Sequence, residues 1–316
     1  MSMRPVLRGL CTYVPVLNRY VASRTGGTNS ARYCYSVWAR HLVMAANQGL
    51  DTCPAIVAEL GPGDSLGIGL AALISGSSMY YAFDVVDFAT TSRNLEIFDE
   101  LVSLFRSRAP IPGSEEFPKV KPQLDTYEFP SAIFTEERLA RALADDRLRT
   151  IRDSVMHPNQ PGSVIEYRIP WYDAKVIDRG VVDMIYSQAV LEHVDDLDNT
   201  YSAMNLWLKP AGHMSHQIDF KCHYTADVWN GHWAHSDFKW KLIRGRQAYL
   251  LNRQPLSTHV RMLGEHGFDV ARDQRVSSTS SLAKSDLAPR FRAMTDEDLV
   301  TSGVYILAVK RTGGSQ

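Results

Sequence analysis

Residues 55–67 read Ala-Ile-Val-Ala-Glu-Leu-Gly-Pro-Gly-Asp-Ser-Leu-Gly, and this stretch decides the fold of the 316-residue chain. An apolar run of strand length reaches Glu59, a glycine turn follows, and residues 68–75 have the small and aliphatic side chains of a buried helix. The glycines can adopt positive φ and let a ligand approach bare backbone. The helix that begins near Ser65 should point unpaired N–H groups into the same space. Together, strand, turn and helix start predict a nucleotide-cofactor site.

Charge indicates which cofactor this turn suits. Asp64 lies inside the turn and Glu59 just before it, and two carboxylates there would repel the pyrophosphate of a dinucleotide. They suit a ligand with a cationic end, such as the amino group of S-adenosylmethionine (SAM). The spacing also departs from the dinucleotide fingerprint, because the third glycine is Gly67 rather than residue 66.

A second strand and a carboxylate strengthen the prediction. Residues 79–83 read as a strand that ends at Asp84, which follows Gly61 by 23 residues (84 − 61). This is close to the separation of roughly 20 residues at which an acidic side chain reaches a ribose hydroxyl. We therefore expect Asp84 to bind the ribose of the cofactor.

Three motifs together resemble the class I SAM-dependent methyltransferases, in particular their small-molecule, type 11-like branch. They are Glu-Leu-Gly-Pro-Gly at residues 59–63, Asp84, and Val-Asp-Met-Ile-Tyr-Ser-Gln-Ala-Val-Leu-Glu-His-Val at residues 182–194. The resemblance covers about residues 55–90 and 163–220. It implies SAM as cofactor and an α/β fold: a Rossmann-like, doubly wound, seven-stranded sheet with an antiparallel edge strand, N-terminal helices and a helical insertion.

The resemblance also indicates where cofactor contacts should lie. A helix before the first strand often covers the cofactor in this family, which predicts a contact from Tyr35. The family's carboxylate after the third strand would fall near Trp171, which could stack on the adenine, with Asp173 as a substitute. The fourth strand delivers its last residues to the carboxyl edge of the sheet, where ligands bind. The predicted cofactor-binding set is Glu59, Gly61, Pro62, Gly63, Ser65, Asp84, Trp171, Ser187, Gln188 and Tyr35.

Composition narrows the class of partner. Lys and Arg number 34 against 35 Asp and Glu, so the chain has no overall positive field, and we expect no nucleic-acid partner. The four cysteines are far apart and form no CxxC pair, which predicts free thiols in a reducing compartment. No apolar run approaches the ~20 residues of a membrane span, and no signal-peptide pattern opens the sequence. A cytoplasmic enzyme is the expectation.

The sequence divides into residues 1–54, predicted as a helical segment covering the cofactor site, and residues 55–316, the methyltransferase domain. Apolar residues at near-helical spacing over 4–21 favour a helix that caps the core over one that docks on a membrane or a partner. Residues 90–160 are more than the connection between the second and third strands requires. We interpret this segment as an insertion that forms a cap or a homodimer surface. Residues 213–256 contain five of the ten histidines, interleaved with tryptophans, and are interpreted as a substrate lid.

Methyl transfer to a hydroxyl requires an acceptor held within about 3–3.5 Å and a group that removes its proton. Histidine titrates near neutrality. We predict His223 as the base and rank His216 second, with Asp219 orienting the imidazole. No metal ligand is assigned, although Asp219 and His223 sharing a divalent ion is the alternative. The expected acceptor is a small molecule: a hydroxyl of a sugar, glycolipid or secondary metabolite.

Two other classes of function stay open. An NAD(P)-dependent oxidoreductase could use the same kind of fold, but Asp64 and the lack of a Tyr-xxx-Lys pair beside a candidate serine argue against it. A non-catalytic scaffold subunit acting through residues 90–160 is the other alternative, and the intact glycine turn with Asp84 argues against that. No Asn-Pro-Pro-Tyr-type pocket follows the fourth strand, which disfavours methylation of amino-purine or glutamine nitrogen.

Overall fold

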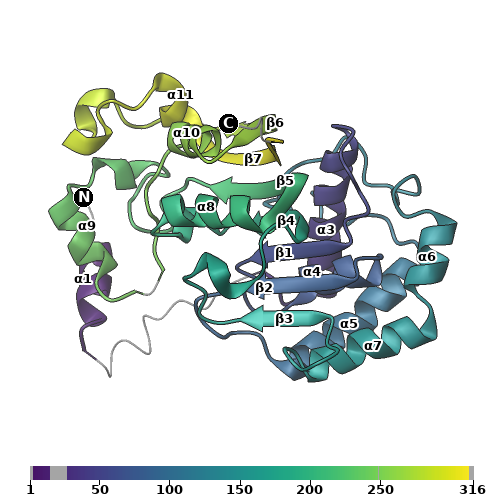
Figure 1. Cartoon of the computed structure of the whole chain (residues 1–316). Coiled ribbons are helices and arrows are strands. Elements are labelled where there is room, and N and C mark those ends of the chain that lie inside the picture. Colours follow the sequence, from purple (N-terminus) through teal and green to yellow (C-terminus); the bar gives the residue numbers. More distant parts are fainter. Residues whose placement is uncertain (1–2, 15–26, 248, 313–316) are drawn as a thin grey trace.

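The computed structural model describes residues 3–14, 27–247 and 249–312. Its centre is a seven-stranded sheet of order β3-β2-β1-β4-β5-β7-β6 (Figure 1). Strands β1 to β5 pair in parallel, and β7 runs antiparallel to both of its neighbours, so the predicted α/β fold class is confirmed. The strands are β1 (Ile56–Leu60), β2 (Met79–Phe83), β3 (Ile165–Arg168), β4 (Val182–Gln188), β5 (Leu208–Asp219), β6 (Phe268–Ser277) and β7 (Thr301–Lys310).

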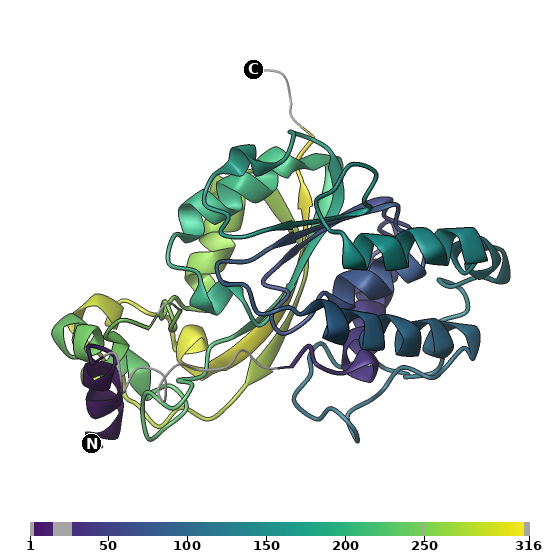
Figure 2. The same cartoon turned by 90° about the horizontal axis from the view of Figure 1, so that it is seen from below.

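Helices cover both faces of the sheet, as its twisted edge-on view in Figure 2 shows. One face packs against α3, α4, α5 and α7, and the other against α8 and α10, with a separate hydrophobic core on each side. The α-helices are α1 (Arg4–Cys11), α3 (Ala31–Ala46), α4 (Gly67–Ile74), α5 (Thr91–Arg106), α6 (Glu136–Ala142), α7 (Asp145–Met156), α8 (Leu197–Trp207), α9 (Asp237–Arg244), α10 (Leu256–Glu265) and α11 (Asp296–Val300).

Residues 90–160 complete the helical layer over one face of the sheet. Their buried side chains, among them Leu101, Phe105 and Ile151, belong to the same core as α3 and α4. The predicted cap over the site is therefore wrong, because this segment packs on the sheet instead. The predicted homodimer surface stays a prediction.

The charged segment of residues 135–155, whose i,i+4 charge pattern predicts a single helix, forms two helices, α6 and α7. The chain becomes extended at Ala144, and Asp145 and Asp146 then occupy the first turn of α7. Carboxylates are favourable at a helix N-terminus, so this pair of aspartates stabilises the start of a second helix. The charge periodicity alone predicts that the first helix continues.

The sequence predicts a strand over residues 213–219 as well as a lid from about residue 213, and the structure confirms the strand. Strand β5 extends to Asp219, and both His213 and His216 are buried within it. Only the chain after Asp219 leaves the sheet. It contains the short 3₁₀ helix Gly231–Ala234 and then α9, which lies beside α1 in both views (Figures 1 and 2).

The N-terminal helix packs on α9 rather than on the main core. Val6 joins Trp240, Ile243, Leu250 and Leu251 in a small separate cluster, so the core-capping interpretation of residues 4–21 is wrong for the part described. Residues 15–21 of that predicted helix lie outside the described residues. No helix in the described ranges is long and apolar enough to cross a membrane.

Candidate functional site

A cavity of about 890 Å³ opens at the carboxyl ends of β1, β2 and β4. Its far wall comes from α1, α9, residues 223–225, and residues 247, 249 and 250. No lining residue falls within 89–170, although the Gln188 amide reaches the carbonyl of Lys121. Seven residues predicted from the sequence line this cavity: Gly61, Pro62, Gly63, Asp84, Trp171, Gln188 and His223.

The glycine turn has the backbone that the sequence predicts. Gly61 and Gly63 have φ of +65° and +75°. The Gly61 N–H donates to the carbonyl of Phe83 at 2.8 Å, which ties the turn to the end of β2. A Cβ at Gly61 would lie 2.7 Å from a methyl carbon of Val190, so only glycine fits there.

Asp84 meets this turn from the next strand. Its Oδ2 accepts from the Gly63 N–H at 3.4 Å, and its Oδ1 accepts from the Val85 N–H at 2.7 Å. Burial raises the pKa of Asp84, while these N–H groups lower it, and burial prevails. The carboxylate is thus held at the cavity edge with acceptor capacity left over for a ligand hydroxyl.

The start of α4 does not offer the free N–H groups that we expected. The Ser65 N–H donates to Thr28 Oγ1 at 3.0 Å, the Leu66 N–H to Asn94 Oδ1 at 2.9 Å, and the Gly67 N–H to Ser65 Oγ at 3.1 Å. Because side chains already occupy this helix terminus, it presents no anion-binding cradle of the kind that holds a pyrophosphate.

Glu59 and Ser65 lie behind the turn and do not line the cavity. Glu59 is 1% exposed, accepts from Tyr80 Oη at 2.5 Å and Tyr186 Oη at 3.3 Å, and is hydrogen bonded to the Gly69 backbone. Burial raises the pKa of Glu59 to about 8. Both residues brace the turn and the helix start in this structure, and neither lines the cavity where we expected a cofactor contact.

Tyr33, and not the predicted Tyr35, lines the cavity. Tyr35 is fully buried and donates to the carbonyl of Ala109 at 2.6 Å. The two tyrosines are separated by about 200° around α3, since each helical residue turns by about 100°. One therefore faces the site and the other faces the core.

Trp171 lies where the resemblance predicts an adenine contact. Its backbone N–H donates to the carbonyl of Asp84 at 3.2 Å, and its ring packs on Phe83 and Trp207 at centroid distances of 5.8 and 5.3 Å. Asp173, the proposed substitute, instead caps a 3₁₀ turn by accepting from the Lys175 N–H.

The predicted base lies on the opposite wall. His223 Nε2 is 3.5 Å from Asp219 Oδ2, and its ring centroid is 5.2 Å from that of His193. Burial would raise the pKa of Asp219, but the hydrogen bond with His223 and the Lys221 N–H outweigh it and leave that pKa lowered. A carboxylate paired in this way can orient the imidazole with its Nδ1 available for an acceptor proton.

His216 and Ser187 do not line the cavity. They hydrogen bond to each other inside the sheet at 2.7 Å, and both are essentially buried. Burial lowers the pKa of His216 to about 3, which makes it a poor base at neutral pH. Asp219 lies behind His223 rather than on the wall itself.

Several lining residues were missed from the sequence. His193 is the most informative: it lies on the 3₁₀ helix Leu191–His193, faces Tyr249 as well as His223, and burial lowers its pKa to about 4. Its position directly after β4 was the available signal. No sequence signal pointed to Arg8 or Tyr249, because these residues reach the site only through the packing of α1 on α9.

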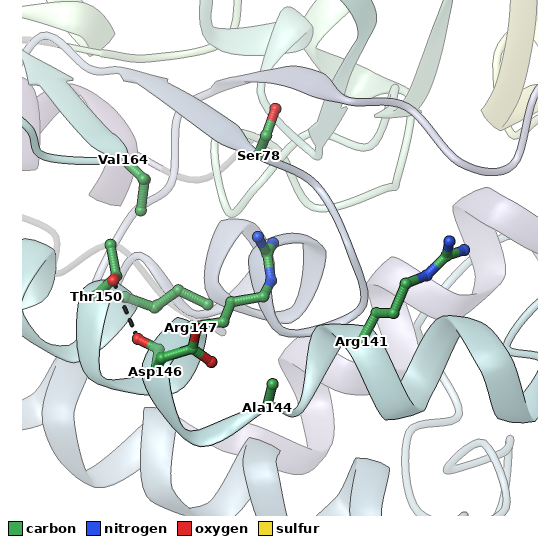
Figure 3. A pocket seen from close by; sticks show the side chains of 8 residues that line it. Ser78, Arg141, Ala144, Asp146, Arg147, Thr150 and Val164 are labelled. Atoms are coloured by element: carbon green, nitrogen blue, oxygen red, sulfur yellow. Dashed lines mark hydrogen bonds between the residues drawn. The ribbon is translucent and has the colours of Figure 1, made fainter.

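A second hollow, of about 520 Å³, lies near the amino ends of β2 and β3 (Figure 3). Arg147 in its wall donates to the carbonyls of Leu73 and Ser77. Ligands of open α/β sheets bind at the carboxyl edge, so this hollow is not the candidate site. Within the described ranges no group of three or more His, Cys, Asp or Glu side chains could hold a metal.

No protein-family model matches the sequence, and no curated protein matches it significantly. Solved structures do match. A SAM-dependent methyltransferase from Mesorhizobium loti is 13% identical, with 85% of this chain and 98% of that chain covered and a TM-score of 0.41. Haemonchus contortus phosphoethanolamine N-methyltransferase 2, solved with SAM, is 13% identical over 87% of this chain and 53% of that chain (TM-score 0.42).

Four features point to the same type of fold: the sheet order, the antiparallel β7, the glycine turn after β1 and the carboxylate after β2. They belong to a Rossmann-like, doubly wound α/β fold with an antiparallel strand, as the sequence predicts. Fold alone does not give the reaction. The [4+2]-cyclase SpnF also matches, at 11% identity over 87% of this chain and 81% of that chain, with a TM-score of 0.43.

Proposed function

We propose that the protein transfers a methyl group from SAM to a small-molecule acceptor in the cavity at the carboxyl edge of the sheet. The observation that carries this proposal is the meeting of Gly63 with Asp84 at the cavity edge, beside a helix start where side chains already pair the N–H groups of residues 65–67. Such a site favours a cofactor with a ribose and a cationic end over one with a pyrophosphate.

The charge of the lining supports the same choice. Among the described lining residues Arg8 is the only Lys or Arg, whereas Asp84, Asp195 and Asp196 are acidic. Arg8 comes from α1, on the far wall from the glycine turn. A dinucleotide would thus place two phosphate charges beside Asp84 with neither a cation nor a free helix terminus to offset them.

The cavity also has room for an acceptor. Ligand pockets usually measure about 300–1,000 Å³, and this one reaches from the glycine turn to His223 and Tyr249. Bound SAM supplies an electrophilic methyl group on a sulfonium. We assign to Asp84 the ribose hydroxyls, to Trp171 one face of the adenine, and to Gly61 and Gly63 close backbone approach.

We assign proton removal to His223. With Asp219 next to its Nε2, the imidazole can take a proton at Nδ1 from an acceptor hydroxyl as the oxygen attacks the methyl carbon. An oxygen acceptor such as a sugar, glycolipid or secondary-metabolite hydroxyl needs this step, whereas a neutral amine does not. A cytoplasmic location accords with the four free cysteines, and a homodimer formed through residues 90–160 is retained as a prediction.

A label-transfer screen tests the function. The protein is incubated with methyl-labelled SAM and libraries of sugars, phenols, glycolipids and amines, and label is counted in the acceptor fraction alongside S-adenosylhomocysteine. We expect transfer to a hydroxyl compound. Transfer to amines alone would overturn the assignment of a base, and SAM binding without transfer to any acceptor would favour the scaffold alternative.

A further inference from the structure

Helix α1 has two unlike faces. Val6 and Gly9 point toward α9, and a Cβ at Gly9 would overlap the carbonyl oxygens of Leu242 and Ile243. The two backbones are therefore in direct contact, and the orientation of α1 is fixed by shape. Four apolar residues at helical spacing lie on the other side of α1 and its flanking turns. We call them the α1 stripe: Met3, Leu7, Leu10 and Val14.

The α1 stripe is unusually exposed. Its side chains are 62%, 57%, 44% and 46% exposed, and neighbouring Tyr13 is 50% exposed. These five account for five of the thirteen exposed large apolar residues in the described ranges, although residues 3–14 are only a small part of them. Single exposed apolar side chains are ordinary, but a contiguous group of this kind marks an interaction surface.

The surroundings of the stripe are basic. Residues 3–14 and 236–247, which form the α1–α9 pair, contain six Lys or Arg and one acidic residue, while the whole chain has a net charge of −1. The acidic residue, Asp237, is already paired with Arg253 and Arg290. Among the basic residues, Arg244 pairs with Asp195, and the guanidinium of Arg246 lies over the ring of Tyr13, 5.0 Å from its centroid. Arg4 and Lys241 have exposed side chains.

We propose that the α1–α9 pair binds the surface of an anionic lipid bilayer. A short helix with an apolar stripe bordered by Lys and Arg is suited to lie in the plane of a membrane interface, with the stripe among the acyl chains and the cations at the headgroups. Neighbouring Pro5, Arg8 and Ile243 line the cavity, so docking would place the cavity next to the lipid surface. The inference does not depend on the proposed methyl transfer.

Vesicle flotation tests the proposal on the full-length protein. Vesicles of phosphatidylcholine alone are compared with vesicles that also contain phosphatidylserine. We expect flotation with the anionic vesicles, little with the neutral ones, and release on raising the salt to about 0.5 M, where charge attraction is screened. Equal flotation with and without phosphatidylserine would contradict the proposed role of anionic lipid. No flotation with either type of vesicle would overturn the proposal.

Variants assign the binding to the stripe. Leu7→Gln with Leu10→Gln should weaken vesicle binding at least about tenfold, because two leucines no longer enter the bilayer. The matched control is Met156→Gln with Val270→Gln, two exposed apolar residues away from α1, which should bind like the wild type. Melting curves of all the proteins should coincide, since each replaced side chain is exposed.

Charge reversal gives an independent arm. Arg4→Glu with Lys241→Glu should reduce binding to anionic vesicles about tenfold or more and leave the melting temperature unchanged. Wild-type binding by either double variant would contradict the proposal. Concentration-dependent dimerisation abolished by the leucine variant, without vesicle binding, would show instead that a second copy of the chain covers the stripe.

Discussion

The backbone N–H of Gly63 lies 3.4 Å from Oδ2 of Asp84, although 21 residues separate the two in the chain. This contact joins the turn after β1 to the end of β2 at the edge of the large cavity. In the proposed SAM site, this contact positions the glycine backbone that the ligand approaches and the carboxylate that accepts from the ribose hydroxyls. The first two predictions therefore concern Asp84 and Gly63.

Asp84→Ala should weaken SAM binding by about 1.5–3 kcal/mol, since charge-assisted hydrogen bonds to the ribose are lost. Calorimetric titration measures the change. Asp125→Ala, which removes an exposed carboxylate that does not line the cavity, is the control and should bind normally. An unchanged dissociation constant in a normally folded Asp84→Ala protein would move the ribose contact elsewhere, with Asp87 as the next candidate.

Gly63→Ala should abolish detectable SAM binding, because a Cβ would stand where the ligand meets the backbone and would lie 3.3 Å from Thr28 Oγ1. Positive φ alone strains alanine, so a matched control is required. Gly180 has φ of +64°, and a Cβ added there would have nothing within 4 Å, so Gly180→Ala should carry similar strain but retain SAM affinity. Equal affinities in the two variants would exclude the turn as the site.

His223→Ala should reduce turnover about 10²–10⁴-fold while leaving SAM affinity nearly unchanged. The readout is release of S-adenosylhomocysteine with the acceptor found by the label-transfer screen. His157→Ala, at an exposed histidine following α7, is the control. EDTA should have no effect; loss of activity with EDTA and recovery with Mg²⁺ would support the alternative in which Asp219 and His223 hold a metal.

Buried histidines should make the fold sensitive to acid. Burial lowers the pKa values of His41, His216 and His232 to about 3, so below pH 6.5 the unfolded chain takes up protons that the folded chain refuses. Each then lowers the free energy of unfolding by about 1.4 kcal/mol per pH unit down to its folded pKa. Glu59, whose pKa is raised to about 8, and Glu192, whose pKa burial also raises, act in the opposite direction as the pH falls. They are two glutamates against six histidines, because burial also lowers the pKa values of His193, His213 and His259 to about 4.

Urea unfolding at pH 7.5, 6.5 and 5.5 checks this sign. The free energy of unfolding should fall clearly between pH 6.5 and 5.5, while the step from 7.5 to 6.5 should be small. A flat or rising stability on acidification would show that these histidines are not buried in their neutral form.

Local sequence was sufficient for the centre of the fold. The apolar run before Gly61, the glycine turn and Asp84 are near neighbours in sequence or on adjacent strands, so periodicity and spacing located them correctly. The same reasoning failed at Tyr35, because composition does not fix the rotation of a helix about its axis. Tyr33, two residues away, has the same chemistry and faces the site.

Histidine content set the start of the predicted lid at about residue 213, inside the strand that the sequence also predicts over residues 213–219. His213 and His216 belong to β5, where partners from distant segments satisfy or surround them, as Ser187 does for His216. Sequence analysis predicts that polar side chains in a strand are exposed, because the distant residues that hydrogen bond to them are not known at that point. The wall formed by α1 and α9 was likewise unpredictable, since it depends on the close contact of Gly9 with a helix more than 220 residues away.

Direct calorimetry of the wild-type protein with SAM and with NADH tests the central claim most directly. We predict a dissociation constant for SAM in the micromolar range, about −8 kcal/mol, similar binding of S-adenosylhomocysteine, and no heat from NADH. Binding of NADH, with no heat of binding from SAM, would contradict the account and favour the oxidoreductase alternative.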